Sequence, residues 1–355
     1  MGAVRCAIVP PYLLAHLADL DDPALEHARL SARRALESDH VSHRIRSGEP
    51  TTMRPPRRTA ATSPSGDLSR PDRAISDAAG TETLPGRLVR SEGDPAVDDT
   101  SVNEAYDGLG ETHALFWEAF SRASIDADGM PLEATVHYGE AYDNAFWDGG
   151  RMVFGDGDGQ VFAGFTRSLS VIGHELTHGV TQYTANLVYS GQSGALNESV
   201  SDVFGALVEQ YSRQQSAADA SWLIGEGIFT DEVEGSALRS MKAPGTAYDD
   251  DVLGKDPQPG HMDDYIDTDD DNGGVHLNSG IPNRAFYLAA TAIGGNAWER
   301  AGRIWYETLT GDITATTDFA GFARATTDVA ARLYGDGSPE RDAVSAAWST
   351  VGVTG

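Results

Sequence analysis

The chain has 355 residues, 40% of them hydrophobic, which is enough for two globular domains with cores of their own. It carries 54 acidic against 26 basic residues, and the formal net charge of −28 argues against a nucleic acid partner because polyanions are repelled. No segment approaches membrane-spanning length, so no membrane partner is expected. A well-solvated acidic surface explains the charge without a cationic partner.

The N-terminal residues are apolar but are interrupted by Arg5 and by the pair Pro10-Pro11. They lack the apolar core and the small-residue cleavage site of a signal peptide. Cys6 is the only cysteine of the chain, which excludes an intramolecular disulfide and leaves the cellular compartment open. Leucines at helical spacing between residues 12 and 36 predict short amphipathic helices.

Two changes of composition divide the rest of the chain. Residues 47–73 contain five prolines among Arg, Ser and Thr, and predict an exposed linker that proteases can cut. Short alternating stretches with Gly and Asp turns follow to about Gly164 and predict a β-rich domain with one helix over residues 105–121. After Leu169 the apolar spacing becomes helical and predicts a helical bundle, with helices over residues 203–211, 284–293, 297–309, 319–333 and 340–351.

The pentapeptide HELTH at residues 174–178 carries the strongest chemical signal. It lies in a predicted helix that Ser168 is suited to cap. On this helix His174 and His178 share one face, and Glu175 turns toward an open coordination position beside them. Two imidazoles one turn apart with a carboxylate between them are typical of zinc hydrolases. The pentapeptide also arises by chance, so the prediction needs further ligands.

A second predicted helix, over residues 194–202 (GALNESVSD), supplies them. Glu198 completes a set of two histidines and one carboxylate, and water then takes the fourth position, as catalytic zinc requires. Asp202 lies one turn beyond Glu198 and is placed to accept the other ring N–H of His174, which would fix its tautomer. We therefore expect one zinc ion per chain, held by His174, His178 and Glu198.

HELTH followed by GALNESVSD resembles the thermolysin family of neutral zinc metallopeptidases. Residues 136–139 and 143–147 resemble the edge strand of that family, residues 155–159 its hairpin, and residues 271–280 its second active-site motif. The similarity runs from about Leu84 to the C-terminus. It implies an α+β fold with a β-rich N-terminal peptidase domain (residues 73–185), a mainly helical C-terminal domain (residues 186–355) and the zinc site in a cleft between them.

The resemblance also assigns catalytic roles. Glu175 would be the general base that takes a proton from water and later gives it to the leaving amine. His276 and Tyr189 would stabilise the negative charge that develops on the carbonyl oxygen. Asp271 would orient the imidazole of His276 and favour its charged, donating form. The chain is thereby predicted to be an endopeptidase.

Substrate contacts follow from the same resemblance. Asn144 and the backbone of Ala145 and Trp147 would pair with an extended peptide as with an added strand, and Arg239 would hold the carbonyl just after the scissile bond. An apolar pocket beside them implies cleavage on the N-terminal side of bulky hydrophobic residues. Ordinary core positions explain each pocket residue equally well. The pocket residues are Phe162, Phe165, Val171, Ile224, Ile228 and Leu238.

The motif PPYLL at residues 10–14 resembles the short propeptide of protealysin-like members of the family. Residues 1–50 are therefore expected to be a removable propeptide that inhibits its own enzyme, followed by a linker over residues 51–72. Cys6 is either a thiolate that caps the zinc in the precursor or a small buried residue beside Ile8 and Val9. We expect a monomer that acts on proteins and peptides and is secreted by a non-Sec route, the alternative being a cytoplasmic enzyme.

Calcium is where the sequence departs most from the family, whose thermostable members use a carboxylate cluster beside the zinc helix. Ser170, Ser221 and Leu223 stand where acids are expected, which leaves Glu209 and Glu226. Because each Ca²⁺ needs six to eight oxygen ligands, the double calcium site is predicted to be absent. A weak single site around residues 249–251 stays open. The sequence GDGDG at residues 155–159 lacks the distal glutamate of a calcium loop and is expected to be a turn.

One alternative belongs to a different class of function. It is an inactive, zinc-stabilised protein that binds peptides in the cleft. A binding module has no need of a complete acid and base set, and Glu175, His276, Tyr189 and Asp271 are all present. Peptide turnover separates the two hypotheses.

Overall fold

The computed structural model describes residues 6–44 and 67–354, without the side chains of residues 39–44, so most of the predicted linker lies outside the described residues. The strands are β1 (Cys6–Ala7), β2 (Arg73–Asp77), β3 (Arg87–Ser91), β4 (Leu132–Val136), β5 (Ala145–Trp147), β6 (Met152–Phe154), β7 (Leu223–Ile224), β8 (Arg239–Ser240), β9 (Asp249–Asp250) and β10 (Gly254–Lys255). The helices are α1 (Pro11–Ala18), α2 (Glu26–Arg44), α3 (Thr100–Phe120), α4 (Leu169–Gln182), α5 (Gly191–Arg213), α6 (Asp271–Asn278), α7 (Gly280–Ile293), α8 (Ala301–Leu309), α9 (Phe319–Tyr334) and α10 (Pro339–Thr350), with 3-10 turns η1 (Pro23–Leu25) and η2 (Met262–Asp264).

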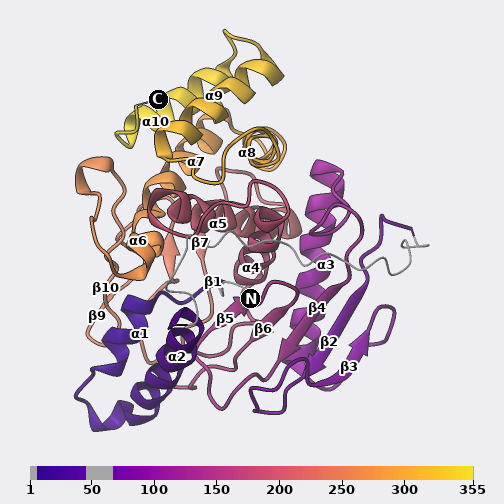
Figure 1. Cartoon of the computed structure of the whole chain (residues 1–355), viewed down its shortest axis with the longest axis vertical. Coiled ribbons are helices and arrows are strands. Elements are labelled where there is room, and N and C mark those ends of the chain that lie inside the picture. The colour runs from indigo at the N-terminus through magenta and orange to yellow at the C-terminus, as the bar shows by residue number, and fades with distance from the viewer. Residues whose placement is uncertain (1–5, 45–66, 355) are drawn as a thin grey trace.

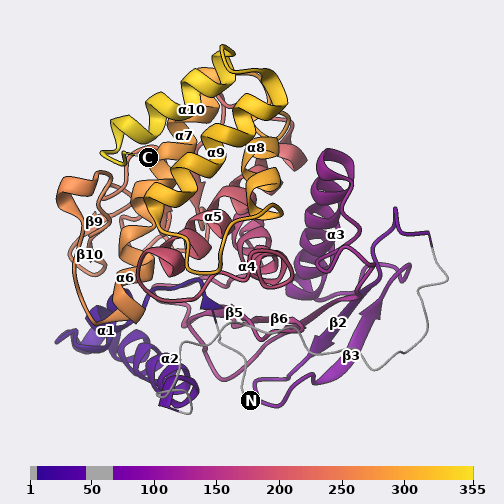
Figure 2. The same cartoon turned by 45° about the horizontal axis from the view of Figure 1, so that its top comes forward.

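The β-rich part forms one six-stranded mixed sheet in the order β1-β5-β6-β4-β2-β3. Strands β2, β4 and β6 run parallel to one another, while β3, β5 and β1 are added antiparallel to their neighbours. Helix α3 packs on β2 and β4 and on α4, as Figures 1 and 2 show. A β-carbon at Gly108 of α3 would lie 2.4 Å from Ile172 Cδ1, so the glycine allows this close approach. The predicted β-rich region with one helix is confirmed.

The C-terminal part is helical, as predicted. Helix α10 packs on α7 and α9, and α7, α8 and α9 contact α5, which lies between them and the sheet (Figures 1 and 2). Each of the five helices predicted after residue 202 overlaps an observed helix, and α8 starts four residues later than predicted. None of the described helices is both long and apolar enough to cross a membrane.

Two details of the predicted sheet are wrong. Residues 136–139 do not form an edge strand, because Val136 ends the interior strand β4. The hairpin between β5 and β6 turns at residues 148–151, not at 155–159. Oδ1 of Asp148 accepts hydrogen bonds from the backbone of Gly150 (2.8 Å) and Arg151 (2.9 Å), and this Asx turn closes the hairpin.

Residues 6–44, here called the N-terminal segment, lie along the edge of the sheet and below the helices, in indigo in Figure 1. Strand β1 pairs with β5, and α1 begins at Pro11, a residue suited to the first helical position. Leu13, Leu14 and Leu17 are buried against the same core as the peptidase part. The short helices predicted here are confirmed, whereas the removal of residues 1–50 stays a prediction.

His137 ties the start of α3 to the loop at residues 155–159. Its Nε2 lies 2.9 Å from Asp99 Oδ2, and its Nδ1 lies 2.8 Å from Asp156 Oδ1. The hydrogen bond to Asp156, together with Asp99 and against the effect of burial, raises the pKa of His137 to about 9. The protonated imidazole of His137 therefore anchors this glycine-rich loop to the start of α3.

We predict that His137→Gln lowers the free energy of unfolding by about 1 kcal/mol near pH 6.5, since the pair is partly screened by solvent. The pKa of His137 is raised in the folded chain, so its contribution is complete below pH 6.5 and is lost as the pH rises through about 9. Urea unfolding at pH 6.5 and pH 10 measures this. A destabilisation that is the same at both pH values contradicts the account, and Asp156→Asn is the matched reciprocal variant.

Candidate metal centre and active site

Helices α4 and α5 carry the predicted metal ligands. Both are buried along nearly their whole length, so they pass through the middle of the molecule (Figure 1). A β-carbon at Gly205 of α5 would lie 2.4 Å from the carbonyl oxygen of Ser170 in α4, so only glycine permits this approach. Ser168 occupies the N-cap position of α4, but its hydroxyl contacts that of Ser170 (3.1 Å) and caps no amide. That part of the prediction is wrong.

The three predicted metal ligands converge on one point. Nε2 of His174 and Nε2 of His178 lie 3.0 Å apart, and carboxylate oxygens of Glu198 lie 3.5 and 3.4 Å from them. All three side chains are fully buried, and Oε2 of Glu198 has no hydrogen-bond partner. Two nitrogens bound to one tetrahedral zinc ion would be separated by roughly 3.3 Å.

The hydrogen bonds of the two imidazoles suit a cation between them. Nδ1 of His174 lies 2.7 Å from Asp202 Oδ1, and Nδ1 of His178 lies 2.9 Å from Asn197 Oδ1. A neutral imidazole that donates from Nδ1 presents a lone pair at Nε2, and two such lone pairs 3.0 Å apart can bind one cation together. Burial, only partly opposed by Glu198, lowers the pKa of His178 to about 4 and keeps it neutral, as a ligand must be. These residues therefore fit a zinc ion.

Asp202 links the metal site to Arg239. Its carboxylate accepts two hydrogen bonds from the guanidinium of Arg239, both 2.8 Å long, in addition to the one from His174. Both charged side chains are fully buried. Burial alone would raise the pKa of Asp202, but Arg239 and His174 hold it well below its usual range. The Nδ2 group of Asn283 also donates to Asp202 (2.8 Å).

Glu175 faces the β5 strand from α4. Its Oε2 accepts a hydrogen bond from the backbone N–H of Trp147 (3.0 Å), while its Oε1 has no partner although the side chain is fully buried. Burial, and then the negative charge of Glu198, raise the pKa of Glu175 well above its usual range. A buried carboxylate with one free oxygen and a raised pKa is suited to exchange a proton.

His276 and Tyr189 approach Glu198 from the other side. Nδ1 of His276 lies 2.6 Å from Asp271 Oδ1, and the tyrosine hydroxyl lies 3.3 Å from His276 Nε2 and donates to Glu198. Burial lowers the pKa of His276, but the charges of Asp271 and Glu198 prevail and raise it to about 9. The backbone from Asp271 through Gly274 is left-handed, which the Asn-Gly-Gly sequence tolerates.

Residues of the N-terminal segment already occupy the predicted substrate contacts. Oδ1 of Asn144 accepts a hydrogen bond from the backbone N–H of Val9 (2.9 Å), and its Nδ2 donates to the carbonyl of Val9 (3.3 Å). The backbone N–H of Ile8 donates to the carbonyl of Ala145 (3.1 Å). Arg239 donates to the carbonyl of Ile8 (3.0 Å).

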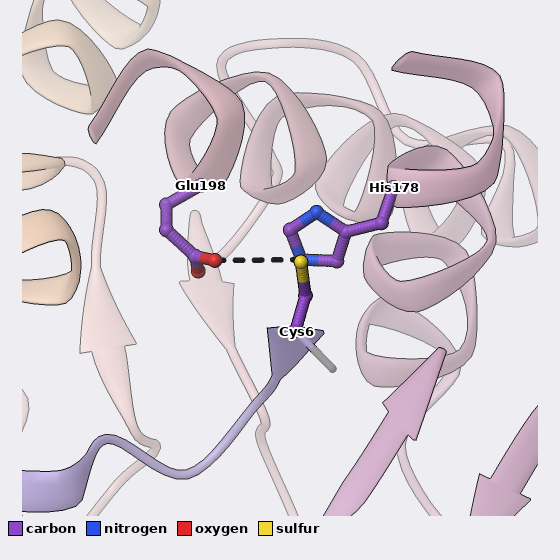
Figure 3. A group of neighbouring side chains, drawn as sticks. All are labelled: Cys6, His178 and Glu198. Carbon is purple, nitrogen blue, oxygen red and sulfur yellow. Dashed lines mark ion pairs between the residues drawn. The ribbon is translucent and has the colours of Figure 1, made fainter. Parts of the chain in front are cut away.

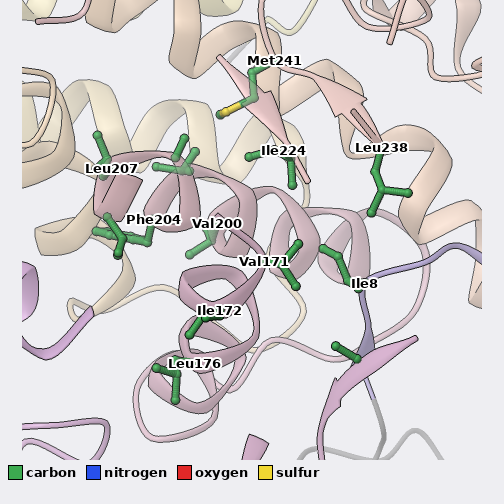
Figure 4. Close-up of a cluster of buried hydrophobic side chains, with 14 of the residues drawn as sticks. Ile8, Val171, Ile172, Leu176, Val200, Phe204, Leu207, Ile224, Leu238 and Met241 are labelled. Atoms are coloured by element: carbon green, nitrogen blue, oxygen red, sulfur yellow. The ribbon is translucent and has the colours of Figure 1, made fainter. Parts of the chain in front are cut away.

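The predicted pocket residues belong to one buried cluster that also contains Ile8. Figure 4 shows Ile8 beside Val171 and Leu238 at one end of that cluster, with Ile224 above α5. Phe162 and Phe165 contact each other with ring centroids 5.4 Å apart, and Ile228 is fully buried.

Cys6 lies beside the metal ligands. Its Sγ, a nitrogen of His178 and an oxygen of Glu198 all lie within 4.8 Å of one another. Figure 3 shows the thiol of Cys6 pointing from β1 toward the imidazole of His178, with the carboxylate of Glu198 opposite. The cysteine packs with Tyr189 and Val275, apart from the cluster that holds Ile8 and Val9. This is the environment that the zinc-capping hypothesis requires.

Sequence reasoning missed three polar residues that support the site. Asn197 and Ser201 contact Nδ1 of His178, at 2.9 and 3.1 Å, and Asn283 contacts Asp202. Asn197 and Ser201 flank Glu198 on the same buried helix face, so their polarity inside an apolar pattern was the available signal. Asn283 lies on α7, far along the chain, and offered none.

Two family models match the chain in succession. Residues 62–182 match the catalytic domain of thermolysin metallopeptidases, and residues 185–353 match their alpha-helical domain. The chain is 49% identical to an extracellular metalloprotease of Pectobacterium carotovorum subsp. carotovorum, over 98% of this chain and 96% of that protein. It is 53% identical to the protease PrtS of Photorhabdus sp. (strain Az29), over 79% of this chain and 76% of that protein.

A solved structure resembles the whole chain. It is the precursor of protealysin, a metalloproteinase from Serratia proteamaculans, with 48% sequence identity and a TM-score of 0.87. The match covers 98% of this chain and 100% of that one. The two-domain fold, the zinc-binding arrangement and these relatives agree. The chain belongs to the thermolysin family of zinc metallopeptidases and is a metalloendopeptidase made as a precursor.

Proposed function

We propose that His174, His178 and Glu198 hold the catalytic zinc of this endopeptidase and that Glu175 is its general base. The observation that carries the proposal is the pair of facing Nε2 atoms, 3.0 Å apart, beside a carboxylate oxygen without a hydrogen-bond partner. Zinc bound there would supply a Lewis acid that polarises a carbonyl and lowers the pKa of water. A protein that merely binds peptides would not need Glu175 next to this site.

Glu175 does the proton work in this proposal. Its unpartnered Oε1 takes a proton from the attacking water, and the same carboxyl group then delivers a proton to the leaving amine. The backbone N–H of Trp147 holds the other oxygen and so fixes the rotamer of the side chain. The raised pKa of Glu175 makes the carboxylate a stronger base than an exposed glutamate.

His276 and Tyr189 stabilise the oxyanion. Asp271 holds the imidazole of His276 from behind, and the pKa of about 9 keeps it charged at neutral pH, so that Nε2 donates. The hydroxyl of Tyr189 lies 3.3 Å from that nitrogen, which places two donors at one position. A positioned pair of this kind acts most strongly where water is excluded, as it is here.

Substrates bind along β5. Asn144 and the backbone of Ala145 and Trp147 offer one edge of the sheet to an extended peptide, and Arg239 holds the carbonyl that follows the scissile bond. Arg239 is kept in place by Asp202, which also orients His174. The buried apolar cluster next to Arg239 favours a bulky hydrophobic side chain immediately after the cut.

The N-terminal segment acts as an inhibitor of its own enzyme. Its residues Ile8 and Val9 contact the same groups that would hold a substrate, so both cannot bind together. Two relatives are named extracellular proteases, and this chain is secreted as well. We propose that export does not use the Sec route, and we expect a monomer, because the site is complete within one chain.

The double calcium site of thermostable relatives is absent in this proposal. Glu209 forms an ion pair with Arg213 (2.6 Å), and the hydroxyl of Ser170 accepts a hydrogen bond from the backbone of Gly225 (3.1 Å). Both groups therefore have partners within the protein. At residues 249–251, where a weak single calcium site stayed open, the carboxylate of Asp250 accepts hydrogen bonds from three backbone N–H groups, two in its own turn and one at Glu234.

Elemental analysis of dialysed protein tests the metal content. We predict about one zinc and no tightly bound calcium pair per chain, because two glutamates cannot supply the oxygens that two Ca²⁺ ions need. Retention of two calcium ions per chain after dialysis without chelator would contradict the proposal.

Glu175→Gln tests the catalytic assignment. After removal of the N-terminal segment, we expect casein hydrolysis to fall by roughly 10²-fold or more, since the amide cannot take a proton, with the zinc content unchanged. Glu226→Gln, at an exposed glutamate outside the site, is the matched control and keeps the wild-type rate. Undiminished casein hydrolysis by the Glu175→Gln variant would refute the assignment.

Asp202→Asn tests whether the hydrogen bond from Asp202 orients the metal ligand His174. We expect zinc affinity to fall about 10- to 100-fold, because the amide cannot accept from both His174 and Arg239 as the carboxylate does. Competition with a chelator measures the dissociation constant. Asp263→Asn, on the exposed η2 turn, serves as control, and equal zinc affinities for both variants would show that Asp202 does not orient His174.

A further inference from the structure

The N-terminal segment lies in the proposed substrate site, and three criteria identify which of its peptide bonds stands at the position of the scissile bond. The first is the donor to the developing oxyanion: Nε2 of His276 lies 3.1 Å from the carbonyl oxygen of Ala7. In the proposed mechanism that donor serves the carbonyl under attack. Ala7 therefore stands where the residue before the scissile bond would stand.

The second criterion is the guanidinium that follows the scissile bond. Arg239 donates to the carbonyl of Ile8 at 3.0 Å, and this is the residue directly after Ala7. The backbone N–H of Ile8 donates to the carbonyl of Ala145 at 3.1 Å, and β1 runs antiparallel to β5. Strand direction and hydrogen bonding agree with a bound substrate.

The third criterion is the side chain after the bond. Ile8 is fully buried and belongs to the cluster that contains Val171 and Leu238 (Figure 4). This is the bulky apolar side chain that the proposed specificity demands. All three criteria select the peptide bond between Ala7 and Ile8.

A bond held in this way beside a base should be cut, so something must protect it. The residue just before Ala7 is Cys6, whose Sγ lies within 4.8 Å of the ligand atoms of His178 and Glu198 (Figure 3). Thiolate is a strong zinc ligand and would fill the coordination position that catalytic zinc keeps for water. Strand β1 directs this side chain, because Cys6 pairs with Trp147 of β5.

We propose that the N-terminal segment is an uncut substrate, in which Ala7–Ile8 occupies the position of the scissile bond and the Cys6 thiolate keeps it intact by excluding the attacking water. This inference rests on the proposed function. Without the thiolate, the water oxygen bonds to the carbonyl carbon of Ala7 and the C–N bond to Ile8 breaks. Both protons of the water end on the nitrogen of Ile8, which leaves an Ala7 carboxylate and an Ile8 ammonium group.

The experiment follows the N-terminus of the full-length, zinc-loaded chain by intact mass and N-terminal sequencing. We expect Cys6→Ser and Cys6→Ala to be cut between Ala7 and Ile8, while the wild-type chain keeps this bond over the same period. Because the bond is bound within its own molecule, the first-order rate constant stays the same over a tenfold range of protein concentration. Wild-type cleavage at this bond at the variants' rate would overturn the role of Cys6.

Replacing zinc with cobalt detects binding of the Cys6 thiolate to the metal without depending on catalysis. The Co²⁺-loaded wild-type precursor is expected to show a thiolate-to-metal charge-transfer absorption, and Cys6→Ala to lack it. If the wild-type spectrum shows no such band, Cys6 does not bind the metal and the inference fails, whatever the folding of the variants.

Two control variants separate the causes of cleavage. Leu17→Ala removes a buried side chain of α1 and loosens the segment without touching the thiolate, so its Ala7–Ile8 bond is expected to stay intact. Glu175→Gln in the Cys6→Ala background is expected to prevent the cut. Cleavage at this bond in either control would contradict the inference.

Assay of a quenched peptide, after removal of residues up to the linker, separates this inference from the function on which it rests. Peptide turnover by this shortened enzyme, together with an uncut Ala7–Ile8 bond in the Cys6→Ala precursor, overturns the inference alone. Absence of peptide turnover by the shortened enzyme overturns the proposed function and this inference with it.

Discussion

Helices α4 and α5 approach each other so closely at Gly205 that a β-carbon there would lie 2.4 Å from a carbonyl oxygen of α4. This contact brings two histidines from one helix and a glutamate from the other to a single point. Burying these side chains without a cation would be unfavourable, because the imidazole nitrogens and the carboxylate would lie close together with no water to solvate them. A metal bound at this point would therefore help to hold the centre of the molecule together.

Asp202 extends that constraint from the metal to the substrate. The same carboxylate accepts from His174, which faces the metal, and from Arg239, which holds a peptide carbonyl. Neither charge is exposed, so each depends on the other, and removing one would leave the other buried alone. In the proposed mechanism, one carboxylate thus orients both a metal ligand and the arginine that aligns the substrate.

Local spacing was enough to predict the helices and the shared helix face of His174 and His178, because residues one turn apart share a helix face whatever the rest of the fold does. Local spacing failed to locate the hairpin. Residues 155–159 (GDGDG) and the turn at Asp148 both have the composition of a turn, and only packing decides which of them connects the two strands. Local spacing also could not show that β5 is already paired. Strand β1 has two residues, too few for any period, and the residues that follow it, Ile8 and Val9, are held by Arg239 and Asn144, more than 130 residues away.

The central claim is that a complete zinc site is covered by residues of its own chain. The most direct measurement incubates the purified full-length chain with zinc and a quenched peptide, and maps the N-terminus as the reaction proceeds. We predict no hydrolysis while the N-terminal segment is intact, and a rate that rises with the fraction of molecules that have lost it. Full-rate hydrolysis by a chain that still begins at Met1 would contradict the account.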